Sequence, residues 1–232
     1  MSAFPLTRVE WRPSYRLVPS RFPPRGLFDR VASAEDLEAV LAVESLTNDR
    51  LRDEVGDITL VPPSERLTGP GATPVMAALT HPSPDGSRFA DDRYGVFYGG
   101  RELETAVRET VHHREQFLAD SDQPPMRIEM REYRVDVVGP LRDLRDNAAA
   151  QPLLDPDSYE QSRPFGVQEW EQGGYGIVYP SVRNPGGECV AVFRTPPLSP
   201  ATQGRHYGYH WDGRQITDVV ELRASHIEPH AD

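Results

Sequence analysis

Apolar and small residues recur at helical spacing in the middle of the chain. From Arg101 to about Ala119 they form one stripe, at Leu103, Ala106, Val107, Thr110, Val111, Phe117 and Leu118. This period predicts an amphipathic helix over 101–119. Glu109 lies at the edge of the stripe, and His113 follows one turn later on the same edge. A carboxylate there borders the core and faces a cleft, although a solvated surface glutamate fits the same pattern.

Runs of β-branched and aromatic residues predict strands on both sides of this helix. They lie at 15–18, 58–61, 94–98, 126–138, 175–179, 188–193, 207–211 and 216–222. The alternation in 126–138 changes phase near Arg131, which predicts a β-bulge. Gly99 and Gly100 indicate a turn before the helix, and residues 184–187 have the turn chemistry of a hairpin loop.

The remaining segments predict short helices and loops. Residues 1–13 read as an irregular lead-in, and 139–157 as a polar connection. The predicted helices lie at 33–46, at 73–80, and from Asp157 or Ser158 to Pro164, which should end or kink the last of them. The mixture predicts one α+β domain over residues 1–232, with mixed small sheets and flanking helices.

Composition narrows the function classes. The 232 residues carry a formal net charge of -11, which argues against direct binding to nucleic acid. The 23 prolines predict many loops. A single cysteine, Cys189, lies in an apolar run, which favours a buried, unreactive thiol and a reducing compartment. No signal-peptide pattern or membrane span is evident, so we expect a soluble cytoplasmic protein.

Five residues at predicted strand ends or at the helix edge could line one cleft: Arg16, Arg88, Tyr98, Glu109 and Ser181. Such a set suits an anionic nucleotide whose glycosidic bond is broken. Arginine binds phosphate through charge-assisted hydrogen bonds, tyrosine stacks on a flat base, and glutamate stabilises the cationic sugar. The absence of an evident second carboxylate points to a good leaving group such as nicotinamide.

Two other kinds of site fit less well. The histidines at 112, 113, 206 and 210 lack the spacing of a known zinc motif, so we expect no metal site. Ser181 follows Pro180 and lacks the glycine pattern of a nucleophile elbow, which argues against a serine hydrolase.

Several motifs together resemble the RES-domain family, the toxins of bacterial RES-Xre toxin–antitoxin pairs. They run from about Tyr15 to Trp211 and comprise YRLVPSRFP, TNDRLRDEVG, GSRFADDRYGVFYGGRELETAVRETVHHRE, GIVYPSVRNPGGECVAVF and GRHYGYHWDG. The Arg, Glu and Ser that name the family fall on Arg88, Glu109 and Ser181.

The resemblance implies a compact fold similar to ADP-ribosyltransferase toxins, with NAD as substrate. It implies that Arg16 and Arg88 bind the phosphates or the nicotinamide ribose, and that Tyr98 packs on the nicotinamide. Glu109 would bind the ribose hydroxyls and stabilise the oxocarbenium-like state, and Ser181 would orient the substrate. It also implies an Xre-like helix-turn-helix antitoxin that covers the active site.

The sequence therefore predicts an NAD-degrading toxin that cleaves the nicotinamide–ribose bond by hydrolysis or phosphorolysis and so arrests growth. Two alternatives stay open, a mono-ADP-ribosyltransferase with a specific protein target and a non-enzymatic nucleotide-binding module. The residues do not reveal which group accepts ADP-ribose. They also leave the oligomeric state open, and a homo-oligomer is one of the alternatives. The sequence also leaves open what residues 33–80, which smaller family members lack, do to site access.

Overall fold

The computed structural model describes residues 4–20, 29 and 56–223, and its strands join one sheet. The strands are β1 (Leu6–Pro19), β2 (Phe97–Gly100), β3 (Met126–Asp143), β4 (Gly176–Pro180), β5 (Glu188–Val192), β6 (Thr202–Trp211) and β7 (Ile216–Leu222). The described helices are α4 (Thr73–Thr80), α5 (Leu103–Asp120) and α6 (Ser162–Glu171), with 3-10 turns at Ile58–Leu60, Pro63–Glu65 and Ala148–Leu154. No described helix combines the length and the apolar run needed to span a bilayer.

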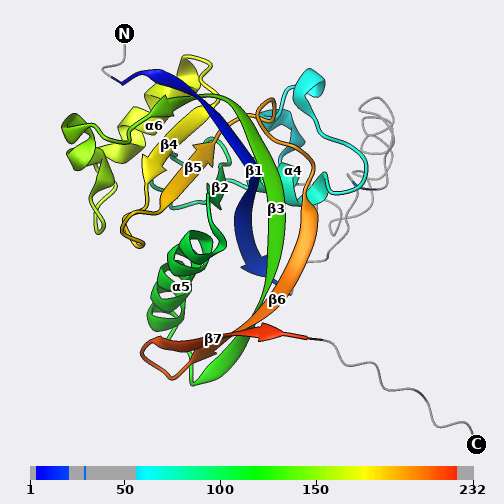
Figure 1. Ribbon diagram of the computed structural model, residues 1–232, viewed down its shortest axis with the longest axis vertical. Helices are drawn as coiled ribbons and strands as arrows, with labels where there is room; N and C mark the ends of the chain where they lie inside the picture. The colour runs from blue at the N-terminus through cyan, green and yellow to red at the C-terminus, as the bar shows by residue number, and fades with distance from the viewer. Residues whose placement is uncertain (1–3, 21–28, 30–55, 224–232) are drawn as a thin grey trace, which may run out of the picture.

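The sheet has the order β1-β2-β5-β4-β3-β6-β7, and β1 pairs with β3 as well. Five strands therefore close into a ring, β1-β2-β5-β4-β3, and β6 and β7 extend it from the outer edge of β3. The pairing of β3 with β4 is parallel, and the other pairings are antiparallel. Figure 1 shows the long, curved β1 and β3 sweeping past α5, with α6 beside β4. The predicted α+β class is confirmed.

Several predicted elements are confirmed. Helix α4 and strand β7 have the predicted bounds, and each end of α5 lies within two residues of its predicted position. The register of β3 against β6 shifts between Arg131 and Tyr133, where the change of phase predicts a bulge. Strands β4 and β5 form the predicted hairpin, whose turn is closed by Gly187 N donating to Asn184 O at 2.8 Å.

Other predictions were wrong at particular residues. Residues 6–13 are not a lead-in but the first half of β1, because Pro13 lies where the register against β3 shifts and a missing N–H costs no ladder bond. Residues 58–60 form a 3-10 turn capped by Asp57 instead of a strand. Pro164 lies in the first turn of α6, where its missing N–H is tolerated, so it neither ends nor kinks that helix.

The glycine pair after the predicted strand also has a different role. Gly99 and Gly100 belong to β2 and pair with Val190 and Cys189 of β5. A Cβ on Gly100 would lie 2.7 Å from the backbone nitrogen of Ala106. The glycine is needed because the strand passes this close to the start of α5, rather than for a turn. The predicted helix at 33–46 lies outside the described residues.

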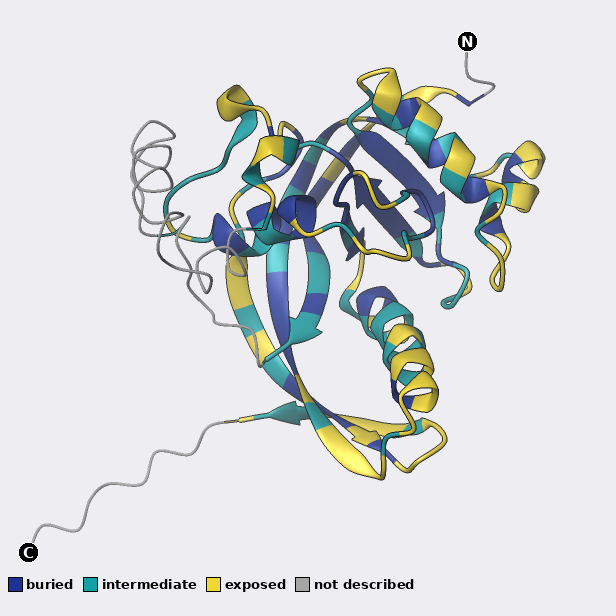
Figure 2. Ribbon diagram, turned by 180° about the vertical axis from the view of Figure 1, so that it is seen from behind, coloured by how far each residue is buried: buried dark blue, intermediate teal, exposed yellow. Residues whose placement is uncertain are grey.

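Three groups of apolar side chains pack against the sheet and hold the helices in place. Figure 2 shows that β4 and β5 are buried along almost their whole length, whereas α5 has buried and exposed faces. One group joins α5 to β1, β3 and β6 through Ala106, Leu17, Met130 and Tyr209. Phe117, predicted to be on the apolar stripe, is 51% exposed. Leu118 beside it is only 3% exposed, so the helix is fixed at both ends, including the half that carries Glu109.

Candidate active site

A cavity of about 1020 Å³ opens between α5, β1 and the loops that precede β2 and follow β4. Its volume lies at the upper end of the range of about 300–1,000 Å³ that is common for small-molecule sites. Four of the five candidate residues line it: Arg16, Arg88, Tyr98 and Glu109. The fifth, Ser181, does not line it but contacts Glu109. The fold therefore brings together residues that lie up to 165 positions apart by their numbers, 181 against 16.

The Glu109 carboxylate contacts two side chains that come after β4 in the chain, Ser181 and Cys189. Ser181 Oγ donates to Glu109 Oε1 at 2.5 Å, and the Cys189 thiol lies 3.7 Å from the same oxygen. The Ser181 hydroxyl in turn accepts from the backbone nitrogens of Arg183 at 3.2 Å and Asn184 at 2.9 Å. Ser181 is thus placed to orient the carboxylate, whereas the resemblance implies that it orients the substrate.

Cys189 adds an apolar wall to this support. The thiol is 3% exposed, and burial raises its pKa well above the ordinary value. It stays protonated at neutral pH and is a weak hydrogen-bond donor to Glu109 rather than a nucleophile. The predicted buried, unreactive thiol is what the structure contains, and its position in the cavity wall is a feature that the sequence pattern did not reveal.

Arg16 enters the cavity from β1. Its Nη1 donates to Tyr98 O at 2.9 Å, and its guanidinium carbon lies 5.3 Å from the centre of the Phe97 ring. Among the described residues its buried Nε has no hydrogen-bond partner. Burial lowers the pKa of Arg16 to about 10, so the side chain remains a cation at neutral pH. A buried cation with an unused donor is suited to an anionic or polar ligand.

Tyr98 is fixed by its hydroxyl group, which leaves its ring to contact a ligand. The hydroxyl accepts from Phe89 N at 3.1 Å and shares a hydrogen bond of 2.8 Å with Ser87 Oγ. Burial raises the pKa of Tyr98 to about 12, so the phenol is neutral at neutral pH. A flat base can therefore pack on a ring whose orientation is set before the ligand arrives.

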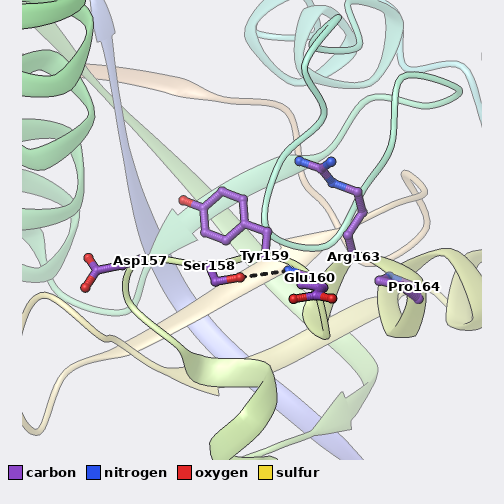
Figure 3. A pocket seen from close by; sticks show the side chains of 6 residues that line it. All are labelled: Asp157, Ser158, Tyr159, Glu160, Arg163 and Pro164. Atoms are coloured by element: carbon purple, nitrogen blue, oxygen red, sulfur yellow. Dashed lines mark hydrogen bonds between the residues drawn. The ribbon is translucent and has the colours of Figure 1, made fainter.

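Arg88 is 7% exposed and is held by the loop at 155–159. Its Nη1 donates to Asp155 O at 2.7 Å, and its guanidinium carbon lies 4.7 Å from the centre of the Tyr159 ring. Tyr159 also lines a neighbouring hollow of about 380 Å³, bounded by Asp157, Ser158, Glu160, Arg163 and Pro164 (Figure 3). Tyr159 therefore separates the hollow from the cavity. Sequence reasoning missed it, because an aromatic residue in a polar loop carries no periodic signal.

Two histidines of α5 line the cavity beside Glu109. The placement of His113 near Glu109, predicted from helix spacing, agrees with the structure. Burial lowers the pKa of His112 and of His113, so both are neutral at neutral pH. His206 and His210 are on β6 and do not line the cavity. No cluster of His, Cys, Asp or Glu in the described part of the chain is arranged to hold a metal ion.

Comparisons with known proteins place these motifs in a family. Residues 64–212 match the family model described as "RES domain", which is more than half of the chain. An uncharacterized protein y4oC of Sinorhizobium fredii (strain NBRC 101917 / NGR234) is 29% identical over 205 residues, which covers 88% of this chain and 84% of that protein. The crystal structure of the M. tuberculosis MbcT-MbcA toxin–antitoxin complex aligns with a TM-score of 0.43 and 13% identity, over 93% of this chain and 86% of that one.

Proposed function

This chain belongs to the RES domain family, and on that premise we propose that it is an NAD-consuming toxin of a toxin–antitoxin pair. The observation that carries the proposal is the cavity that gathers Arg16, Arg88, Tyr98 and Glu109. In it the proposed substrate, NAD, loses nicotinamide, and ADP-ribose passes to water or phosphate. A cytoplasmic, Xre-like antitoxin that covers the cavity is part of the proposal.

The charge inside the cavity supports an anionic substrate. Of the described residues that line it, four are arginines, Arg16, Arg88, Arg114 and Arg183, and two carry carboxylates, Asp91 and Glu109. Asp91 is already paired with Arg93, whose Nε lies 2.7 Å from its Oδ2. Among the described residues, the lining therefore holds more arginines than carboxylates, although the whole chain carries a formal net charge of -11. Guanidinium groups in a partly desolvated site bind phosphate strongly.

Among the described residues that line the cavity, Glu109 is the carboxylate without an ion pair to arginine, which supports cleavage of a bond with a good leaving group. When the nicotinamide–ribose bond breaks, its electron pair moves to the positively charged ring nitrogen, and nicotinamide leaves as a neutral molecule. The sugar carbon becomes cationic, and Glu109 can stabilise that charge and accept from the ribose hydroxyls. A general acid is not required, because the leaving group needs no proton. Water then adds to the same carbon and releases a proton to solvent, or phosphate adds through one of its oxygens.

Each neighbour of Glu109 has a part in this scheme. Ser181 fixes the carboxylate from the side away from the cavity. Tyr98 supplies a ring for the nicotinamide, and Arg16 offers an unused buried donor at the cavity wall. An unpaired buried donor costs about 1–3 kcal/mol, a cost that a ligand oxygen would remove.

The test compares purified protein with two variants of α5. Glu109→Gln removes the charge at the cavity, and Glu104→Gln is its control, because Glu104 is exposed and pairs with Arg108 at i,i+4. We expect nicotinamide release by the wild type and by the control, and a loss of about 10²–10³-fold in kcat for Glu109→Gln.

The products identify the acceptor. Free ADP-ribose indicates hydrolysis, its 1″-phosphate indicates phosphorolysis, and label on one protein of a cell extract indicates transfer. If NAD is stable under all three conditions at concentrations where the wild type binds it, the enzymatic proposal is wrong and a binding module remains.

A further inference from the structure

Two arginines from distant parts of the chain converge on one loop at the cavity wall. Arg88 Nη1 donates to the carbonyl oxygen of Asp155, and Arg183 Nη2 donates to the carbonyl oxygen of Pro156, the next residue. The two guanidinium groups are therefore anchored at successive residues of the same loop. Both residues line the cavity. Arg183 also follows Ser181 by two positions, and its backbone nitrogen donates to the hydroxyl that supports Glu109.

The loop holds these arginines without neutralising them. Asp155 Oδ1 is occupied by the backbone nitrogens of Asp157 at 2.8 Å and Ser158 at 2.9 Å, so its carboxylate closes the loop. No described carboxylate lies within ion-pair distance of Arg88. Among the described residues, the acid within ion-pair distance of Arg183 is Asp157, at 3.9 Å and with a side chain 87% exposed, a contact worth little in water.

Both side chains are fixed and still have donors to offer. The ring of Tyr159 covers one face of the Arg88 guanidinium, and the Arg183 side chain is 18% exposed. An arginine has five N–H donors in a planar fork, and each of these carbonyl oxygens takes one of them. Since a carbonyl dipole does not cancel a unit charge, the pair presents two net charges and a set of fixed donors to one region of the cavity.

The geometry points to a site for a phosphate oxyanion formed by Arg88 and Arg183, with Arg183 as a ligand-binding residue of the cavity. Paired guanidinium groups match the charge and spacing of phosphate oxygens. Two sources would supply this chemistry at the proposed active site: the diphosphate of a dinucleotide, and inorganic phosphate that accepts ADP-ribose. The first makes Arg183 a substrate-binding residue, and the second makes it an acceptor-binding residue.

The test uses Arg183→Gln, with Arg127→Gln as a control. Arg127 is exposed at the start of β3 and lies 3.5 Å from Glu129, its one ion pair within the described residues, so this control removes the same charge away from the cavity. Arg183→Lys keeps a charge but lacks the fork. Circular dichroism establishes that each variant is folded. Calorimetry then measures binding of ADP-ribose and of inorganic phosphate, and steady-state assays follow nicotinamide release from NAD and from nicotinamide riboside.

If the site holds the diphosphate, Arg183→Gln should raise the Kd for ADP-ribose and the KM for NAD by about 10–100-fold. The KM for nicotinamide riboside, which has no phosphate, should not change. If it holds inorganic phosphate, binding and stimulation by phosphate should be lost while the KM for NAD is kept. Arg183→Lys should fall between Arg183→Gln and the wild type in either case.

The inference rests on the proposed function only for the kinetic arm. Weaker ADP-ribose or phosphate binding in Arg183→Gln, without NAD turnover by any form, would keep the site and refute the proposed reaction. Turnover with binding constants and KM values equal to those of Arg127→Gln would keep the reaction and overturn the site.

Discussion

Removing the Ser181 hydroxyl should test whether this group positions the Glu109 carboxylate, because the change leaves the cavity side of Glu109 intact. Ser181→Ala deletes an oxygen that donates to Glu109 Oε1 at 2.5 Å and accepts from two backbone nitrogens, those of Arg183 at 3.2 Å and Asn184 at 2.9 Å. The residue is 9% exposed and does not line the cavity, so a direct effect on ligand contacts is not expected.

The magnitudes follow from these contacts. A hydrogen bond to a charged group contributes about 1.5–3 kcal/mol, and each buried N–H left unpaired costs about 1–3 kcal/mol. Water from the adjacent cavity can replace part of this, so we expect the free energy of unfolding to fall by about 2–4 kcal/mol. The released carboxylate can also move. A displacement of about 1 Å at a catalytic group lowers kcat by about 10²-fold, whereas KM should change little.

Ser199→Ala is the matched control. The Ser199 hydroxyl also accepts from a backbone nitrogen, that of Asp136 at 2.9 Å, but it lies outside the cavity. It should lose stability and keep kcat. Urea unfolding gives the stability of both variants, and nicotinamide release gives kcat and KM. A kcat for Ser181→Ala within about threefold of the wild type, or an effect confined to KM, would refute the positioning role.

The remaining predictions concern the site and the structure around it. Gly166→Ala would place a Cβ against the carbonyl of Phe89, and the overlap should lower the free energy of unfolding by about 1–3 kcal/mol in urea; an unchanged midpoint contradicts this. Burial lowers the pKa of His112 and of His113 from 6.5, so the unfolded chain binds protons first and stability should fall below pH 6.5. The drop in Tm below pH 6.5 should be smaller when both histidines are changed to Gln. An equal drop in that variant would show that these histidines do not cause it. Because Cys189 is 3% exposed and burial raises its pKa, a thiol reagent should react with it far more slowly in the folded than in the unfolded protein, and equal rates would contradict this.

The sequence predicted best the parts that have a regular period. The stripe on α5 locates Glu109 and His113 on one edge, and the change of phase near Arg131 locates the bulge of β3. These signals are local, since side chains only a few residues apart decide them. Each depends on one element, and so each could be predicted without knowing what packs against it.

The parts that failed depend on contacts between distant residues. Pro13 hides a strand because its tolerance rests on a register shift against β3. Gly100 resembles a turn residue because its neighbour in space, the backbone of Ala106, is not evident in the sequence. Tyr159 and the convergence of Arg88 with Arg183 are likewise set by how loop 155–159 closes, and only the folded structure contains that information.

The net charge of the whole chain and the charge of the cavity lining lead to different conclusions about ligands. A net charge of -11 repels a polyanion, whose binding depends on many phosphate contacts spread over a surface. A nucleotide meets only the groups around it, because at physiological salt charges beyond about 8 Å are largely screened. Arg16, Arg88 and Arg183 all line the cavity, where that screening is weaker. The acidic composition therefore argues against nucleic acid as a ligand and is fully compatible with a small phosphorylated one.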